Sequence, residues 1–251
     1  QQQHGEQPVV ETIQINFPPS VLEHFREAKY TKQLGYQLPE TAHYLFDRSE
    51  KIRAYLAHLK LIVDQFNELF GMSSEPEWPL LQPSLDLVLQ NVQDAAGPIT
   101  WKSNRVDDFI VKIKCELKGC RATWDKLKEN HAGVLRILDE WGQRPLFRRN
   151  KTQSYSLSAF DNFHSTNVQA RYKVIHNSAL HLQSLLEDSM IVSANNWTSP
   201  HWAEYASYMR KLCADWLTAF VRQNLVHLAD EVTCVLPPAE FTRKVEENDD
   251  D

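Results

Sequence analysis

The sequence is poor in glycine, with seven residues in 251, and runs of β-branched residues are rare. This combination favours helices over a β-sandwich or barrel. No apolar run approaches the roughly 18 residues that a membrane span requires. The phosphate-binding patterns GxxxxGK[ST] and GxGxxG are missing, as are GxSxG and HExxH. We therefore expect an all-α segment that is not an enzyme, holds no cofactor and has no membrane partner.

Charge is spread unevenly along the chain. The formal net charge is −6, and the last twelve residues, EFTRKVEENDDD, carry six acids and two bases. These twelve residues therefore hold −4 of the total and leave −2 for all the others. Phosphate binding needs a concentrated basic face, so a nearly neutral body excludes nucleic acid as the main partner.

The four cysteines form no CxxC pair. Cys115 and Cys120 are five residues apart, which places them about 140° apart around a helix, so they cannot grip one metal from the same face. We interpret these two, with Cys213 and Cys234, as reduced thiols of a cytoplasmic protein. Because the chain does not begin with Met, we interpret it as a piece of a longer protein.

Apolar residues spaced alternately by four and three positions dominate the chain, a pattern typical of packed helices. The longest run has ten such steps, from Val106 to Trp141. We expect one side of this helix to be buried, with core residues Ile113, Leu117, Trp124 and Leu138. It predicts a helix of about 38 residues, longer than most globular helices. One polar residue, His131, lies on it, and we interpret this side chain as a core or rim histidine rather than a ligand or pH-sensitive group. We expect an elongated stack of long antiparallel helices forming helical bundles.

Caps and helix breakers divide the chain into segments. We expect an extended lead-in at residues 1–16, a helical-bundle segment at 17–236 and an acidic extended tail at 237–251. The expected helices span residues 20–34, 39–70, 80–96, 103–141, 158–194 and 199–233. Gly97 and Pro98 predict a turn between two packed helices rather than a domain linker, with Trp101 filling the corner.

Two short motifs invite a metal-site interpretation. Glu40 and His43 form an ExxH motif, and Asp161 and His164 form a similar one. Bundles that hold two irons use two ExxH motifs and two further inward glutamates near the helix middles. Both motifs here lie in the first turns of helices, so we interpret them as surface positions. A metal-dependent bundle enzyme using Glu40 and His43 is the alternative.

Two loops carry side chains of the kinds that dominate protein interfaces, namely aromatic residues and arginine. The candidate interaction residues are Trp78, Arg144, Phe147, Arg148 and Arg149. The arginines would prefer an acidic partner surface. The other interpretation is that both loops are simply solvated.

Several motifs, in order, resemble the tail of dynein heavy chains. Residues 15–69 contain the NF-P lead, the REAKY helix ending at Gly35, the PE-x-A helix start and the EK-x-R-x-Y run. Residues 97–110, GPITWKSNRVDDFI, and residues 201–228, with Trp202, Tyr205 and Tyr208, match two further tail patterns. The resemblance covers roughly residues 13 to 240, and the REAKY version is closer to axonemal than to cytoplasmic dyneins. Asp215–Trp216 and Asn224 depart from the family's usual Gly and Ser.

The resemblance implies a non-catalytic structural and interaction segment of an ATP-driven microtubule motor, whose motor ring and microtubule-binding stalk lie elsewhere in the heavy chain. Implied partners are dynein intermediate and light chains, other dynein heavy chains and axonemal docking proteins. The implied location is the cytoplasmic cytoskeleton, in the axoneme of a cilium or flagellum. The alternative is an unrelated helical-rod scaffold or tethering protein.

Overall fold

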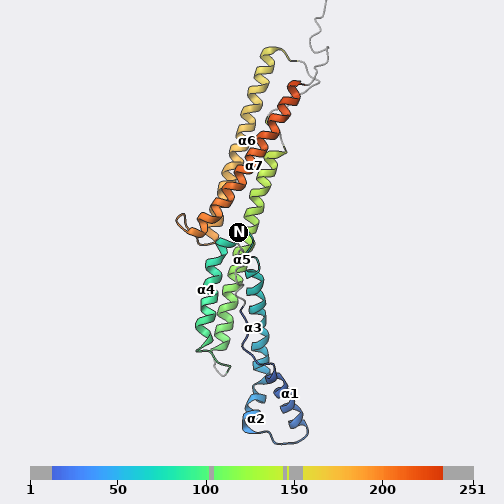
Figure 1. The fold of residues 1–251 in the computed structure, drawn as a ribbon, viewed down its shortest axis with the longest axis vertical. Helices are drawn as coiled ribbons and strands as arrows, with labels where there is room; N and C mark the ends of the chain where they lie inside the picture. Colours follow the sequence, from blue (N-terminus) through green and yellow to red (C-terminus); the bar gives the residue numbers. More distant parts are fainter. Residues whose placement is uncertain (1–12, 102–104, 144–145, 147–154, 234–251) are drawn as a thin grey trace, which may run out of the picture. The chain divides into compact units, whose positions relative to one another are not determined.

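The computed structural model describes residues 13–101, 105–143, 146 and 155–233. These residues contain seven α-helices and no strand, which confirms the predicted all-α class (Figure 1). The helices are α1 (Ser20–Gln33), α2 (Glu40–Asp47), α3 (Ser49–Phe70), α4 (Trp78–Ala96), α5 (Val106–Gly142), α6 (Leu157–Val192) and α7 (Pro200–Thr233). Residues 1–126 and 127–251 form two compact units, and the boundary falls inside α5. The predicted acidic tail at 237–251 and most of the predicted lead-in lie outside the described residues.

The prediction of one helix over residues 39–70 is wrong. The chain forms α2 and α3 there, separated at Arg48, whose torsions (φ −95°, ψ −1°) depart from those of an α-helix. Helix α2 packs against α1, and the Lys32 ammonium lies 4.8 Å from the centre of the Phe46 ring. Tertiary packing of α2 on α1 thus overrides the helical periodicity that continues through the break.

The first unit has its core between α3, α4 and the first half of α5. Predicted core residues Ile113, Leu117 and Trp124 are all buried there. Their neighbours in the same cluster include Ile62, Phe66 and Leu69 of α3 and Leu81, Leu85 and Val88 of α4. The corner after Gly97 is filled as predicted, since Trp101 is half-buried against this core and meets Phe17 edge-on at 5.1 Å.

The second unit is built from the rest of α5 with α6 and α7. Helix α5 buries Leu127, Asn130, His131, Val134, Ile137, Leu138 and Trp141 in this unit. Helix α7 buries Trp202, Tyr205, Met209 and Phe220, whereas α6, with 36 residues, buries only Ser189. The unit therefore has a thin core, supplied mainly by α5 and α7.

Contacts between helices show that successive helices alternate in direction. Tyr55 and Glu68 of α3 meet Asp107 and Arg121 of α5, so these two helices run the same way. In the second unit, Asn130 and Trp141 of α5 bond to Ser189 and Ser178 of α6 respectively, so this pair is antiparallel. In the first unit α3 and α5 are therefore parallel, and in the second unit α5 and α6 are antiparallel, in line with the antiparallel bundles that the sequence predicts.

Candidate interaction surfaces

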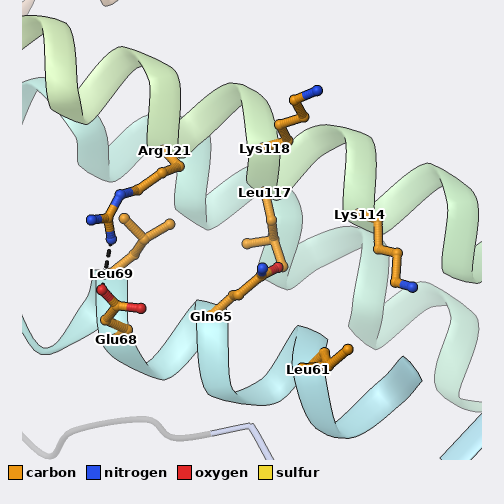
Figure 2. A pocket seen from close by; sticks show the side chains of 8 residues that line it. All are labelled: Leu61, Gln65, Glu68, Leu69, Lys114, Leu117, Lys118 and Arg121. Carbon is orange, nitrogen blue, oxygen red and sulfur yellow. Dashed lines mark hydrogen bonds and ion pairs between the residues drawn. The ribbon is translucent and has the colours of Figure 1, made fainter. Parts of the chain in front are cut away.

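A groove of about 520 Å³ runs between α3 and α5 in the first unit (Figure 2). Its lining residues are Leu61, Gln65, Glu68 and Leu69 of α3 and Lys114, Leu117, Lys118 and Arg121 of α5. Apart from one adjacent pair on each helix, neighbouring lining positions are three or four residues apart and so share one face. Leu69 and Leu117 are buried and form the floor, while Leu61 is exposed.

The groove carries more positive than negative charge. Arg121 donates to Glu68 at 2.7 Å and lies 3.2 Å from Asp125, and these carboxylates raise the pKa of its guanidinium. Lys114 donates to Nδ1 of His58 at 2.8 Å. Among the described residues, neither Lys114 nor Lys118 forms an ion pair with a carboxylate. An acidic surface would be complementary to this part of the unit.

A polar contact ties the start of α5 to α3. The Tyr55 hydroxyl donates to Oδ2 of Asp107 at 2.7 Å, and Lys51 Nζ lies 3.4 Å from the same oxygen. The Tyr55 hydrogen bond, with Lys51 as a further cause, holds the pKa of Asp107 below its usual value. Contact with Tyr55 and then with Asp107 raises the pKa of Lys51. Lys51 and Asp107 are more than half exposed and Tyr55 is buried, so this contact positions the two helices rather than forming a reactive site.

Trp78 is the first residue of α4 and is half-buried. Its ring meets Phe70 edge-on at 5.3 Å and packs against the core of the first unit. Part of this side chain therefore stabilises the bundle, and its predicted role in docking a partner stays a prediction.

The other four candidate interaction residues, Arg144, Phe147, Arg148 and Arg149, lie outside the described residues. Within that loop the structure describes Leu146, whose backbone N–H donates to Oδ1 of Asn224 at 2.8 Å. This bond places Leu146 beside α7.

The positions weighed as metal ligands lie on the surface. His43 pairs with Asp47 at 2.9 Å, and both side chains are more than half exposed. In the part of the chain that the structure describes, no group of three or more His, Cys, Asp or Glu could hold a metal ion. Cys115 is exposed, while burial raises the pKa of the Cys120 and Cys213 thiols. Cys234 lies outside the described residues.

His131 is buried in the second unit, as predicted for a core histidine, and its ring meets Tyr208 edge-on at 5.8 Å. Beside it, Asn130 Nδ2 donates to Oδ2 of Asp188 at 2.9 Å and to Oγ of Ser189 at 3.1 Å. The amide thus bridges α5 and α6. Sequence analysis missed this contact because Asn130 lies one position off the apolar periodicity.

Large apolar side chains remain exposed on α6 and α7. They are Leu157, Val168, Tyr172, Val174, Leu180 and Ile191 of α6, and Leu217, Val221, Leu225, Val226 and Leu228 of α7. Several of them continue the spacing of four and three that predicts packed helices, yet they are exposed in the structure. No helix within the described residues has a stretch apolar enough to cross a membrane.

Comparison with known proteins gives a consistent result. Residues 2–109 match the family described as dynein heavy chain, N-terminal region 1. The dynein axonemal heavy chain 17 of Mus musculus is 26% identical over 227 residues, which is 90% of this chain and 5% of that relative. The ciliary dynein beta chain of Heliocidaris crassispina is 25% identical over 219 residues, or 87% of this chain and 5% of the relative.

A more distant relative extends the same pattern. The dynein beta chain of the flagellar outer arm of Chlamydomonas reinhardtii is 20% identical over 252 residues, covering 89% of this chain and 6% of the relative. The chain thus spans about 5% of the length of the first two relatives. These matches confirm the resemblance seen in the sequence: the chain is similar to a stretch of axonemal dynein heavy chains, and its residues 2–109 match a dynein heavy chain N-terminal region.

Proposed function

We propose that this chain is a scaffold segment of an axonemal dynein tail, which binds associated chains and neighbouring heavy chains through its helical surfaces. The observation that carries this proposal is the similarity to axonemal heavy chains over nearly the whole chain. The large apolar side chains left exposed on α6 and α7 support it, because apolar side chains that folding leaves in water are available for contact with another protein.

The partners proposed are dynein intermediate and light chains, other dynein heavy chains and axonemal docking proteins. The location proposed is the axoneme, since the relatives are named as axonemal, ciliary or flagellar outer-arm chains. In this proposal the parent heavy chain is an ATP-driven microtubule motor. In this proposal the segment catalyses no reaction itself and acts by holding other chains in place.

The test uses the full-length heavy chain in ciliated cells that lack the endogenous copy. We expect a heavy chain without residues 13–233 to lose co-purification of its intermediate chains and to be depleted from axonemes. A control deletion of equal length elsewhere in the same tail reports on general disruption. Normal recovery of all associated chains and normal entry into axonemes would overturn the proposal.

A finer test addresses the predicted interaction residues. The double change Arg148→Glu and Arg149→Glu reverses the basic loop, and Trp78→Ala removes the aromatic candidate. Arg136→Glu serves as a matched control, because Arg136 is an exposed arginine on α5 outside both loops. Loss of one associated chain with the double change, but not with the control, is expected if the loop docks an acidic partner. Unchanged recovery with both test variants would remove these residues from the interface.

A further inference from the structure

The connection between α6 and α7 presents a tryptophan to water. Trp197 is 67% exposed, and its ring meets the buried Trp202 edge-on at 5.7 Å. The indole is therefore held against a core residue while about two thirds of its surface stays open. Tryptophan is among the residues that most often dominate the binding energy of protein interfaces. We call residues 193–199 the Trp197 loop.

The Trp197 loop is fixed by its own hydrogen bonds. Asn195 donates to the Ser193 carbonyl at 3.2 Å and accepts from the Ser199 hydroxyl at 2.7 Å. Asn196 Oδ1 accepts from the backbone N–H and the hydroxyl of Thr198, at 3.0 and 2.7 Å. A partner that binds Trp197 therefore meets a loop that is already ordered, which lowers the entropic cost of binding.

The charges beside the loop on α6 and α7 are all negative. From residue 174 to residue 209 the chain has three acids, Glu187, Asp188 and Glu204, and no lysine or arginine. Glu187 lies about 7.5 Å along α6 from the end of that helix, and Glu204 lies about 6 Å along α7 from its start. Neither of these two glutamates forms an ion pair with a cation of the described chain.

The nearest cations on these two helices are too distant to offset the acids. Lys173 lies about 28 Å along α6 from the loop, and Arg210 lies about 15 Å along α7 from it. Both distances exceed the screening length of about 8 Å at physiological ionic strength. The two helices that carry the loop therefore leave it with an excess of negative charge.

The third helix of this unit, α5, does not reverse that excess. Residues 121–129 of α5 contain three bases and two acids. Arg121 is paired with Glu68 and Asp125, and the bases Lys126 and Lys128 also have partners of their own in the described chain. With all of these groups counted, the acids of α6 and α7 still leave the surroundings of the loop negative.

We propose that the Trp197 loop docks a basic segment of another protein chain, with an arginine or lysine over the open face of Trp197. The indole ring attracts a cation through its π-electrons, more strongly than the rings of Tyr or Phe do. Glu187 and Glu204 bind further basic residues of the same segment. This inference rests on the proposed scaffold function and deepens it by naming the surface and the partner's chemistry.

The chain itself is a poor occupant of this surface. Its own basic stretch at 144–151 adjoins Leu146, which bonds to Asn224 about 36 Å along α7 from the start of that helix. A second copy has a net charge of −6, so it would approach an acidic surface against electrostatic repulsion. The surface therefore fits a different, basic chain.

The test places an aromatic photo-crosslinking amino acid at position 197 of the full-length heavy chain, within the assembled dynein complex purified from axonemes. Leu180 is the control position, because it is 54% exposed on α6 and has no acid within one turn. Mass spectrometry identifies the crosslinked peptide. We expect the probe at 197 to capture a lysine- or arginine-rich segment of another chain at about ten times the yield at 180. Equal yields, no crosslink, an acidic or neutral peptide, or a peptide from a second copy would overturn the inference.

Point changes measure the strength of the contact. Trp197→Ala should weaken retention of the crosslinked chain about tenfold, whereas Leu180→Ala should leave it unchanged. Glu204→Lys should also weaken retention, and reversing the facing basic residue of the partner should restore it. Asp161→Lys is the matched charge control, because Asp161 is an exposed acid near the other end of α6. Equal effects of Glu204→Lys and Asp161→Lys would count against a local contact at the Trp197 loop.

The two proposals can fail separately. A heavy chain that enters axonemes with its associated chains but gives no contact at position 197 would overturn the loop inference alone. A heavy chain that never joins a dynein complex would overturn the scaffold function and the loop inference together.

Discussion

Helix α5 contributes to both units, and its two halves meet different partners. In the first unit, every buried residue of α5 is apolar, and α3 buries six large apolar or aromatic side chains of its own. In the second unit, α5 buries Asn130 and His131 among its apolar residues, and α6 buries only Ser189. A continuous apolar periodicity on one helix therefore does not guarantee that its partners complete a core.

In the second unit, directional contacts between helices accompany a thinner apolar core than that of the first unit. Trp141 Nε1 donates to Oγ of Ser178 at 2.6 Å, and Arg171 donates to the Trp141 carbonyl at 3.0 Å. With the Asn130 amide, these bonds join α5 to α6 at two levels. Polar contacts of this kind specify the register of two helices more than they add stability.

The largest expected effect lies in the first unit, at Trp124. This side chain is 4% exposed, and Trp124→Ala should lower the free energy of unfolding by about 3–5 kcal/mol. Trp197 in the second unit is 67% exposed and meets Trp202 edge-on, so Trp197→Ala should cost no more than about 1.5 kcal/mol. Urea denaturation of the two variants measures both values. Equal costs would show that the two units do not differ in the way described.

The next effect tests the polar contact in the second unit. Asn130→Ala removes the bonds to Asp188 and Ser189 and should cost about 1–3 kcal/mol, because one of the lost hydrogen bonds is made to a carboxylate. Asn167 is an exposed control on α6 that donates to the carbonyl one turn earlier, and its change to Ala should stay within about 0.5 kcal/mol. Both values come from the same urea denaturation. If Asn130→Ala lowers the free energy of unfolding no more than the control change does, then the Asn130 amide does not stabilise the pairing of α5 with α6.

Two glycines on α5 provide a matched pair, one in each unit. A Cβ at Gly119 would meet nothing within 4 Å, so Gly119→Ala should stabilise the protein by about 0.5–1 kcal/mol through helix propensity. A Cβ at Gly133 would lie 2.9 Å from Cδ1 of Leu185, so that side chain must shift to admit it. We expect Gly133→Ala to gain clearly less or to lose stability, as thermal unfolding would show. Equal gains would mean that α6 approaches α5 less closely at Gly133 than the structure indicates.

The smallest effect concerns the contact between Tyr55 and Asp107 at the start of α5. Tyr55→Phe removes the hydrogen bond that depresses the pKa of Asp107, so this pKa should rise toward the ordinary value of about 3.9. Because the folded-state pKa is lowered, the contact stabilises the fold above the unfolded-state pKa and loses this effect as pH falls through the folded-state value. An NMR titration of the Asp107 carboxyl measures the shift. Tyr30→Phe, at an exposed tyrosine of α1, should leave the titration unchanged.

Much of the fold follows from sequence periodicity alone. The helix expected at residues 103–141 is present as α5, which spans Val106–Gly142. The residues expected in its core are all buried, namely Ile113, Leu117, Trp124 and Leu138. The ordered motifs also predicted the axonemal dynein resemblance that comparison with known proteins confirms. Local rules succeed here because an apolar spacing of four and three is stable only as a helix with one covered side.

Tertiary structure decided which apolar rows became core. Val221, Leu225 and Leu228 continue the spacing along α7 yet stay exposed, and the helix expected over 39–70 breaks at Arg48. Trp78, considered as an interaction residue, is half-buried against Phe70. The physical reason is that periodicity reports which side of a helix is apolar, whereas burial depends on whether another element lies against that side. That neighbour is set by contacts between residues distant in the sequence, which no local pattern records.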